Sequence, residues 1–291
     1  MLTVVIPTFN RCETLKKALA AHQAQKAQQQ VAEIIVVDDG STDSTALVVA
    51  QASKESAVPI RYFRQENKGP AAARNVGIRE AKSELILFTD DDIIPSPDLV
   101  AEHLAWHGKY PGEETAVLGC VTWAPEINPT PFMRWYGVEA LFSFAEIAGH
   151  IEVDWRFFYT CNISLNKNFV HRSGGFDEDF KAAAWEDIEL GFRLTRAGMR
   201  IFYNATAVAY HEQRTSFVDA CIRYKKSMQA AEIFKQKDAG RQHPELTMEV
   251  SPVKKRFKGY LAPLLSPLKG FMDWRLPLPW RVYRTMFRIY R

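Results

Sequence analysis

The chain has 291 residues, of which 47% are hydrophobic and 24% are charged, and it is therefore expected to be globular with a sizeable buried core. No charged-then-apolar signal precedes Leu2–Ile6, and no apolar run reaches the roughly 20 residues of a membrane-spanning helix, so neither export nor a membrane span is expected. The four cysteines are far apart, which argues against structural zinc and a disulfide framework and favours a reducing cytoplasm.

The net charge of +3 conceals an uneven distribution. Residues 251–291 contain ten Lys or Arg and a single acid, Asp273, whereas the first 250 residues contain 27 basic and 33 acidic residues. A slightly acidic body with a basic tail indicates a separate partner for the tail, either an anionic membrane surface or a nucleic acid.

The first 120 residues alternate short β-branched runs with helical stretches, which predicts an α/β domain around a largely parallel sheet. Strands are expected over Thr3–Ile6, Glu33–Val37, Ile60–Arg64 and Glu84–Phe88. Helices are expected over residues 12–25, 42–53, 70–81 and 97–109. Ligands of open α/β sheets bind beyond the carboxyl ends of the strands. Three of these ends carry polar, turn-forming residues: Pro7, Thr8 and Asn10; Asp38, Asp39, Gly40 and Ser41; and Asp90, Asp91 and Asp92.

The three consecutive aspartates Asp90, Asp91 and Asp92 directly follow the apolar run Leu85–Phe88. Carboxylates packed this closely raise one another's pKa, and a bound divalent cation is the usual means of keeping them all ionised. A solvated acidic turn is the alternative, but such turns rarely end a core strand and pass directly into another apolar segment. The triplet is therefore interpreted as a metal site.

Two further groups could contact a nucleotide, and each also has a structural explanation. Asp38 and Asp39 could accept hydrogen bonds from a base or ribose, or they could form an ordinary turn before a helix that Ser41 caps. The small-residue segment Gly69–Gly77 includes Arg74, which could bind a phosphate. Close packing of a helix on the sheet explains the alanines of this segment equally well.

The second half of the chain begins with an aromatic-rich stretch, residues 122–156, which could form a loop-and-helix cover over the site. A strand near residues 158–165 is expected to follow. The remaining expected elements are a helix from Trp185 or Glu186 to about Arg196 that Gly198 ends, strands near 200–203 and 207–210, and a helix from about Ser216 to Lys237.

A second acidic pair, Glu186 and Asp187, lies at the start of the predicted helix. The helix dipole favours carboxylates there, so a structural role needs no ligand. Asp187, however, lies off the core face of the helix with Gly191 one turn later, which would leave open space for a substrate hydroxyl. Asp187 is thus a candidate general base. His211 ends a predicted strand, where a lone histidine is more often a core or surface residue than a metal ligand.

Together these motifs resemble the family 2 glycosyltransferases of the GT-A fold over about residues 1–212. In chain order, the matching residues are Pro7, Thr8, Asn10 and Arg11; Asp38 to Ser41; Gly69 to Gly77; Asp90 to Asp92; Gly174, Gly175, Phe176 and Asp177; Trp185, Glu186 and Asp187; and His211. The resemblance implies a Rossmann-like, mixed but mostly parallel sheet flanked by helices. Residues 1–120 would be the nucleotide-binding half, 121–212 the acceptor and catalytic half, and 213–291 a helical, basic extension.

The resemblance also implies a nucleotide-sugar donor, a UDP-, GDP- or dTDP-sugar, bound over the first half of the sheet with Asp39 near the base. The implied donor contacts are Pro7, Thr8, Asn10, Arg11, Asp38, Asp39, Gly69, Arg74, Asn75, Asp90 and Asp91. Mn2+ or Mg2+ would be held against the donor diphosphate by Asp90, Asp92 and His211. An alignment that begins at Thr89 leaves Asp91 as the alternative to Asp90.

The implied reaction is an inverting transfer of one sugar to an acceptor hydroxyl. A cation fixed by carboxylates would stabilise the charge that develops on the departing diphosphate. Asp187, with Glu186 beside it, would take the proton of the acceptor, and Trp185, Asn162 and Trp155 would lie on the acceptor side. The chain has no Gln-x-x-Arg-Trp motif of the processive polymerases, which favours transfer of a single sugar.

The last segment, read as a helix over residues 280–291, places Arg281, Arg284, Arg288 and Arg291 on one arc and aromatic residues on the opposite half. Such a helix is typical of peripheral contact with an anionic membrane, here at the cytoplasmic face, and would suit a glycan or lipid-linked acceptor. The alternatives are docking of this face on the protein's own body or a homodimer contact. No nucleic acid is expected.

Two other functions compete with this interpretation. A sugar-phosphate nucleotidylyltransferase would share the nucleotide-binding sheet, but it would carry a glycine-rich loop where this chain has Pro7–Arg11. A non-catalytic nucleotide-sugar binding or scaffold protein would need no base, so Asp187 counts against it.

Overall fold

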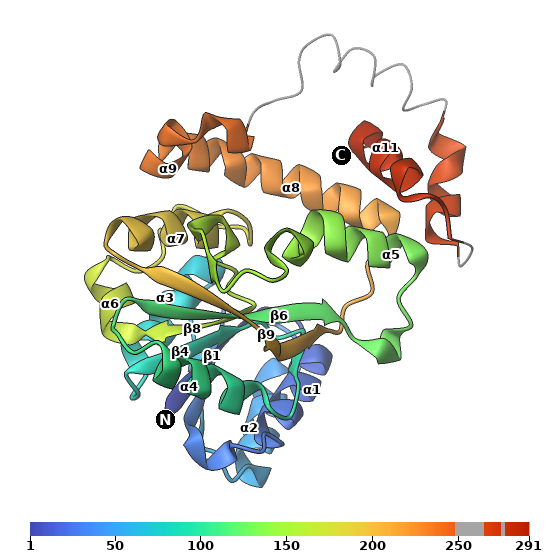
Figure 1. Ribbon diagram of the computed structural model, residues 1–291. Coiled ribbons are helices and arrows are strands. Elements are labelled where there is room, and N and C mark those ends of the chain that lie inside the picture. Colours follow the sequence, from blue (N-terminus) through green and yellow to red (C-terminus); the bar gives the residue numbers. More distant parts are fainter. Residues whose placement is uncertain (248–264, 275–276, 291) are drawn as a thin grey trace. The chain divides into compact units, whose positions relative to one another are not determined.

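The computed structural model describes residues 1–247, 265–274 and 277–290, coloured along the chain in Figure 1. The chain divides into two compact units. Unit 1 comprises residues 1–122 and 147–212, and unit 2 comprises residues 123–146 and 213–291. The domain boundary at residue 212 stays a prediction, and the aromatic stretch 123–146 belongs to the same compact unit as the C-terminal residues.

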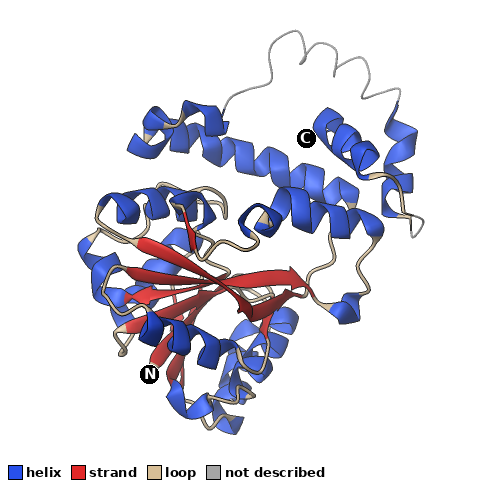
Figure 2. Ribbon diagram, viewed as in Figure 1, coloured by secondary structure: helices blue, strands red, loops and turns tan. Residues whose placement is uncertain are grey.

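Unit 1 is built around a nine-stranded sheet with the order β3-β2-β1-β4-β8-β6-β9-β5, in which β7 pairs with β9. The first four strands, β1 (Leu2–Thr8), β2 (Val31–Asp38), β3 (Ile60–Arg64) and β4 (Leu85–Thr89), are parallel. Three of them, β1, β2 and β4, are nearly continuous buried apolar runs, as expected for strands covered by helices on both faces. Figure 2 shows this sheet in red among its blue helices. The predicted fold class is confirmed.

The remaining strands form antiparallel pairs. They are β5 (Ile93–Pro95), β6 (Thr115–Trp123), β7 (Glu152–Val153), β8 (Asn162–Asn166) and β9 (Arg200–His211). The two predicted strands at 200–203 and 207–210 are one strand, β9. The polar residues between them suggested a turn, but the Asn204 side chain accepts a hydrogen bond from the Thr206 amide (3.0 Å) within an extended chain. The strands β5, β6 and β7 were not predicted.

Five helices of unit 1 lie close to their predicted positions. They are α1 (Cys12–Gln23), α2 (Thr45–Glu55), α3 (Pro70–Glu80), α4 (Leu99–Lys109) and α7 (Glu186–Arg196). The short helix α6 (Lys167–Arg172) was not predicted. A Cβ atom at Gly77 of α3 would lie 2.2 Å from Val5 Cγ1, so this glycine allows α3 to approach β1 closely. Close packing of α3 on the sheet therefore explains its small residues, which was the structural explanation given for them above.

Two histidines, His22 of α1 and His103 of α4, are fully buried in unit 1. His103 pairs with Ser164 Oγ (2.8 Å) and Asn162 Oδ1 (2.9 Å). Neither ring nitrogen of His22 has a hydrogen-bond partner among the described residues. Burial lowers the pKa of each histidine to about 4, because the charged imidazolium loses its hydration.

The free energy of unfolding is therefore expected to fall in mild acid. The unfolded chain protonates these histidines near pH 6.5, whereas the folded chain protonates them only near pH 4. Stability is complete above about pH 6.5 and declines as the pH drops toward 4, by about 3 kcal/mol per histidine. Urea unfolding of His22→Leu should show a larger gain over the wild type at pH 5 than at pH 7. Equal gains at both pH values would contradict this assignment.

Unit 2 contains α5 (Pro131–Tyr136) with the π-helical turn Gly137–Leu141, α8 (Phe217–Gln236), α9 (Asp238–Gln242), the 3-10 helix η7 (Ser266–Asp273) and α11 (Trp280–Tyr290). Its core is aromatic. Phe132 and Trp135 of α5 contact Tyr283 of α11 at ring-centroid distances of 5.9 Å, and Phe217 of α8 contacts Phe287 of α11 at 6.5 Å.

The aromatic face of α11 is therefore buried inside unit 2, with Tyr283, Met286 and Phe287 all in the core. The predicted helix is confirmed, but this face is not available to a bilayer, and docking on the protein's own body is the alternative that the structure shows. Amphipathic periodicity indicates which face is buried and not what covers it. No helix in the described parts of the chain is long and apolar enough to cross a membrane.

Candidate functional site

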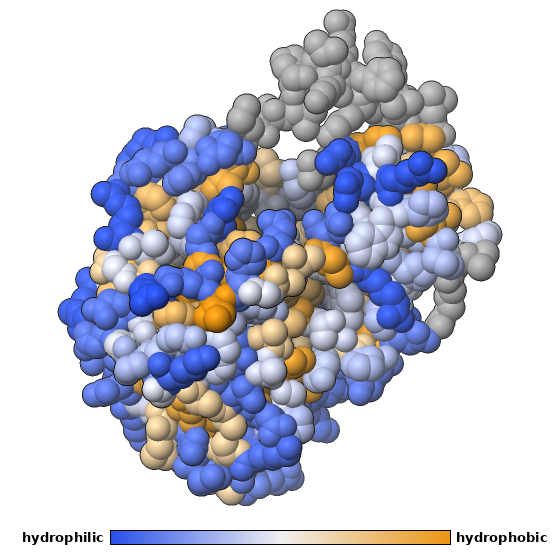
Figure 3. All heavy atoms as spheres, viewed as in Figure 1, coloured by the Kyte–Doolittle hydropathy of each residue, from blue (hydrophilic) through white to orange (hydrophobic). Residues whose placement is uncertain are grey.

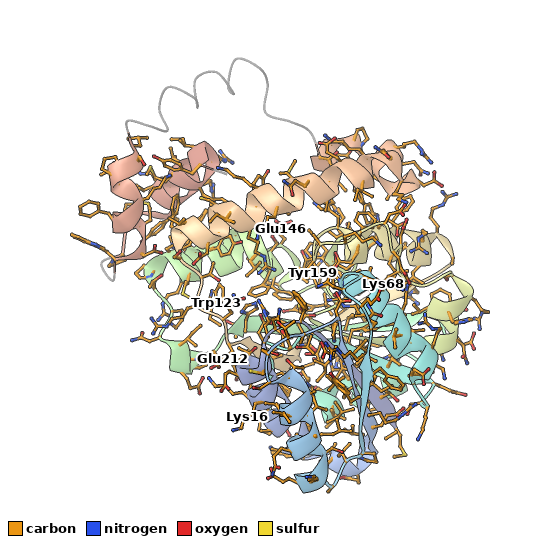
Figure 4. All side chains as sticks on the ribbon, turned by 180° about the vertical axis from the view of Figure 1, so that it is seen from behind. Lys16, Lys68, Trp123, Glu146, Tyr159 and Glu212 are labelled. Atoms are coloured by element: carbon orange, nitrogen blue, oxygen red, sulfur yellow. The ribbon has the colours of Figure 1, made fainter. Side chains whose placement is uncertain are left out.

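The polar residues predicted at the strand ends lie along one edge of the sheet in unit 1. Thr8 of β1 is in register with Asp38 of β2, and Thr89 of β4 with Asn162 of β8. Figure 4 shows the molecule from behind, with Lys68, Tyr159 and Glu212 marking the chain after β3, before β8 and after β9. The parallel strands thus deliver their carboxyl ends, and the aspartate triplet after β4, to a common edge.

Asp91 faces into the protein. Its carboxylate accepts hydrogen bonds from Thr8 Oγ1 (2.7 Å) and Arg11 Nη1 (3.1 Å). Burial, together with the charge of Asp92, raises the pKa of Asp91 to about 7. Asp91 therefore connects the ends of β1 and β4, and protein groups already occupy both of its oxygens.

Asp92 lies between a guanidinium and an imidazole. Arg11 Nη1 donates to Asp92 Oδ2 at 2.5 Å, and His211 Nε2 is 3.7 Å from the same oxygen. The short strand β5 explains this approach, because Ile93, which follows Asp92, is in register with His211 of β9. The structure therefore brings together Asp92 and His211, as predicted, and adds Arg11 to both Asp91 and Asp92.

Arg74 joins the two acidic clusters. This buried side chain donates from Nη2 to Asp90 Oδ1 (2.8 Å) and from Nη1 to Glu186 Oε1 (3.0 Å). The Asp90 side chain is 32% exposed, against 6% for Asp91 and Asp92, so it is the accessible member of the triplet. One guanidinium thus connects α3, the end of β4 and the start of α7.

The start of α7 carries two carboxylates in different surroundings. Glu186 is buried, its Oε2 atom has no hydrogen-bond partner among the described residues, and burial and the charge of Asp187 raise its pKa to about 7. Asp187 is half-buried and accepts one hydrogen bond, from the Ile188 amide (2.8 Å). Burial raises the pKa of Asp187 as well, against the lowering effect of Arg74. A carboxylate with few hydrogen bonds and a raised pKa suits a general base.

The open space predicted above Gly191 is absent. A Cβ atom there would lie 2.6 Å from Phe158 Cβ and 2.8 Å from the Trp155 carbonyl oxygen. The glycine lets the turn η5 (Trp155–Phe157) approach α7, and the Trp155 ring packs edge-on against Phe192 at 5.2 Å. Gly191 is therefore a packing residue, and the prediction of space for a hydroxyl at this point was wrong.

The carboxylates of Asp38 and Asp39 bind neighbouring loops. Asp38 accepts hydrogen bonds from the Ser41 amide (2.7 Å) and the Tyr62 hydroxyl. Asp39 accepts from Gln65 Nε2 and from the amides of residues 68 and 69, all within 2.8 Å. Both carboxylates therefore shape the loops at the carboxyl end of β2, as the turn alternative expected. The residue before α2 is Ser44, so the expected cap by Ser41 was wrong. The proposed contact of Asp38 and Asp39 with a base stays a prediction.

Asn10, Gly69 and Asn75 also fix loop geometry. Asn10 has a left-handed backbone (φ 53°) and accepts from the Thr42 amide (2.7 Å). Gly69 has φ 93°, and a Cβ there would lie 2.6 Å from the Lys181 carbonyl oxygen. The Asn75 side chain pairs with both the N–H and the C=O of Phe176 (2.8 and 2.9 Å), which joins α3 to the Gly174–Asp177 motif.

Of the three residues predicted on the acceptor side, two are half-buried and one is in the core. Trp185 has φ 71° immediately before α7, and Trp155 packs on α7. Asn162 is buried, and its amide donates to the carbonyls of Cys120 (3.1 Å) and Ala207 (2.9 Å). The side chain of Asn162 therefore holds strands together, and no observation places it against an acceptor.

Sequence reasoning missed Cys161 and the role of Arg11. Cys161 precedes Asn162, the residue opposite Thr89, so it lies beside Asp90 at the sheet edge. Burial and the charges of Asp90, Asp187 and Asp92 raise the pKa of its thiol well above the usual range. Nothing in the sequence around Cys161 indicates this position, because it follows from the pairing of β8 with β4.

Some of the side chains that could bind a metal ion lie close together at this edge. Among the residues that the structure describes, no three His, Cys, Asp or Glu side chains form a ready group that could hold a metal ion. Asp92 and His211 do supply an oxygen and a nitrogen donor 3.7 Å apart, and Asp90 supplies an accessible carboxylate. These donor types suit Mn2+, and the carboxylates suit Mg2+, so the residues present fit such an ion.

Comparison with known proteins gives a consistent result. The sequence model "Glycosyl transferase family 2" matches residues 3–174. The chain is 35% identical over 223 residues to a validoxylamine A glucosyltransferase of Streptomyces hygroscopicus subsp. jinggangensis, covering 68% of this chain and 52% of that protein. It is 30% identical to a hyaluronan synthase of Pasteurella multocida, over 73% of this chain and 24% of the synthase.

Solved structures show the same fold at low sequence identity. The mannosyltransferase PcManGT from Pyrobaculum calidifontis, in complex with GDP-Man and Mn2+, aligns with a TM-score of 0.67 and 19% identity over 99% of this chain and 84% of that chain. S. aureus TarS in complex with UDP-GlcNAc aligns with a TM-score of 0.58 and 15% identity over 99% and 89% of the two chains. The chain spans about half the length of the first curated relatives that it matches.

Proposed function

The chain belongs to glycosyl transferase family 2 and is a sugar transferase, and from this premise we propose a metal-dependent, inverting transfer of a sugar from a nucleotide-sugar donor to a hydroxyl of a glycan or lipid-linked acceptor. Family membership leaves no support for a nucleotidylyltransferase or a non-catalytic scaffold. The observation that carries the proposal is the buried Arg74, which joins the aspartate triplet to the carboxylates of α7 through Asp90 and Glu186.

Asp90, Asp92 and His211 are the residues that would hold Mn2+ or Mg2+. When bound, such an ion supplies positive charge that stabilises the diphosphate as it leaves. Arg11 and Arg74, which contact the same carboxylates, keep these side chains in place and add positive charge around the diphosphate. The hydrogen bonds of Asp91 to Thr8 and Arg11 favour Asp90 over Asp91 as the partner of Asp92.

Asp187 is the proposed general base. Its carboxylate takes the proton of the acceptor hydroxyl while the acceptor oxygen forms a bond to the anomeric carbon and the bond from that carbon to the diphosphate breaks. Attack in line with the leaving group inverts the anomeric configuration. Because burial raises the pKa of Asp187, the carboxylate is a stronger base than an exposed aspartate.

The proposed donor is a guanosine or a uridine diphosphate sugar. The solved relatives are complexes of GDP-Man in one case and of UDP-GlcNAc in the other. The loops that Asp38 and Asp39 fix, at the carboxyl ends of β2 and β3, are proposed to receive the base, with their backbone groups rather than the two occupied carboxylates making the contacts.

The proposal is tested by measuring release of nucleoside diphosphate from UDP- and GDP-sugars without acceptor, in Mn2+, in Mg2+ and in EDTA. Slow hydrolysis of at least one donor is expected with a metal and none in EDTA. Undiminished hydrolysis in EDTA would contradict the metal dependence. Failure of every donor to bind with either metal would contradict the assignment of the donor site.

Within the triplet, Asp92→Asn is expected to weaken Mn2+ binding by about 10- to 100-fold, as is usual when a metal site loses a supporting group. Asp91→Asn is the matched control. It makes the same substitution one residue away, and it should retain Mn2+ affinity while lowering stability, because Asp91 connects β1 with β4. Electron paramagnetic resonance of free Mn2+ measures both affinities. A larger loss of Mn2+ affinity in Asp91→Asn than in Asp92→Asn would identify Asp91 as the ligand.

A further inference from the structure

The 3-10 helix η7 exposes a row of large apolar side chains. With three residues per turn, residues spaced by three lie above one another on a 3-10 helix. Leu268 and Phe271 have this spacing and are 41% and 44% exposed, and Trp274, which follows the helix, is 53% exposed. The rings of Phe271 and Trp274 are in contact, with centroids 4.4 Å apart. Met272 points the other way and is buried.

This row is fixed to the body of unit 2. Asp273 accepts a hydrogen bond from the Phe217 amide at the start of α8 (2.8 Å), and Lys269 Nζ lies 4.2 Å from the centre of the Tyr290 ring of α11. A second tryptophan, Trp280, begins α11 and is 46% exposed. A cluster of large apolar side chains that folding leaves exposed indicates a contact surface.

The surroundings of the row are basic. Within η7 and α11 there are four Lys or Arg, Lys269, Arg281, Arg284 and Arg288, and one acid, Asp273, whose carboxylate accepts a hydrogen bond from the Phe217 amide. Lys269 has the spacing of the buried Met272 and lies off the row, whereas Arg281 and Arg288 of α11 are exposed. Figure 3 shows apolar and strongly hydrophilic surface side by side over α11 and η7.

From this combination we propose that Leu268, Phe271, Trp274 and Trp280, termed here the η7 surface, insert into the headgroup region of an anionic lipid bilayer, with Arg281 and Arg288 against the lipid phosphates. Tryptophan and phenylalanine favour the boundary between water and acyl chains, and clustered basic residues are attracted to anionic headgroups. A nucleic acid would use the basic residues but gain little from Leu268. Apart from Trp280, the aromatic side chains of α11 are buried and are not part of this surface.

The experiment is co-sedimentation of the full chain with vesicles of phosphatidylcholine alone and of phosphatidylcholine with phosphatidylglycerol, at low and high salt. Binding to the anionic vesicles and loss of binding in high salt are expected. Phe271→Ser combined with Trp274→Ser should reduce the partition coefficient by at least about tenfold. Arg281→Gln combined with Arg288→Gln should weaken binding and flatten its salt dependence.

Leu47→Ser is the matched control, because Leu47 is an exposed apolar residue (74%) on α2 of unit 1. It should leave vesicle binding unchanged. All substituted side chains are exposed, and circular dichroism confirms folding of each variant. Donor hydrolysis should be the same in every variant, so loss of the lipid contact is distinguished from failure of the proposed transfer.

Three results would overturn the proposal. The first is no partitioning of the wild type to anionic vesicles. The second is equal partitioning of the Phe271→Ser, Trp274→Ser variant. The third is a dimer or an RNA complex, seen by light scattering or gel shift, that the same double variant abolishes in the absence of lipid binding, since the η7 surface would then serve a second copy of the chain or a nucleic acid.

Discussion

Replacing Asp187 by asparagine is expected to abolish sugar transfer while leaving donor and metal binding intact. The amide has nearly the shape of the carboxylate and still accepts a hydrogen bond from the Ile188 amide, but it does not take a proton. Loss of a general base typically lowers the rate by about 10²- to 10⁴-fold. The measurements are kcat with acceptor and the Kd of the donor by calorimetry. A variant that transfers at the wild-type rate would remove Asp187 from the mechanism.

The pH dependence provides a second readout of the same residue. The carboxylate is active only when ionised, so the rate should rise with pH through the pKa of Asp187, which burial places above that of an ordinary aspartate. The acid limb should disappear in Asp187→Asn. Glu186→Gln is the neighbouring control. Glu186 is buried against Arg74, so its loss should affect stability and positioning, and the acid limb should remain.

Replacing Arg74 by methionine is expected to destabilise unit 1 by about 3–5 kcal/mol, the usual cost of breaking a buried ion pair. Methionine fills much of the space of the side chain, but it leaves Asp90 and the buried Glu186 without their shared cation. Urea unfolding at pH 7 measures the loss. Donor hydrolysis should fall as well in whatever fraction stays folded, because Asp90 and α7 lose their common support.

Two variants distinguish the loss of this buried ion pair from the loss of a positive charge in general. Glu186→Gln in the Arg74→Met background removes one of the two uncompensated charges and should restore part of the stability. Arg172→Met breaks the exposed pair with Glu113 and should leave the unfolding midpoint unchanged. Arg74→Met with wild-type stability would show that hydration or protonation, rather than Arg74, stabilises these carboxyl groups.

Much of the fold was predictable because its strands are encoded locally. The runs that became β1, β2 and β4 are mostly apolar, and the turn residues after them marked the edge where the site lies. The element order and the position of the aspartate triplet followed from that pattern. The strand β5 did not, because three residues are too short to show a periodicity, although β5 brings His211 beside Asp92.

The partners of individual side chains were less predictable. Arg74 seemed suited to a phosphate, and its contacts with Asp90 and Glu186 depend on elements 16 and 112 residues away. Gly191 suggested open space, yet the turn at Trp155 fills it. In both cases the residue type is compatible with two different surroundings, and the packing of segments distant in the sequence decides which one occurs. The same holds for α11. Its amphipathic periodicity was evident from the sequence, but the segments that pack on its apolar face were not.

The pairing of β5 with β9 makes the position of His211 depend on the number of residues in β9. His211 reaches Asp92 through a ladder in which Ile93, Ile94 and Pro95 oppose His211, Tyr210 and Ala209. Alternate residues of a strand face opposite sides, so a slip of one residue would turn the imidazole to the other face of the sheet. Deleting one residue between 204 and 206 could therefore remove His211 from the site without changing a single residue that contacts it.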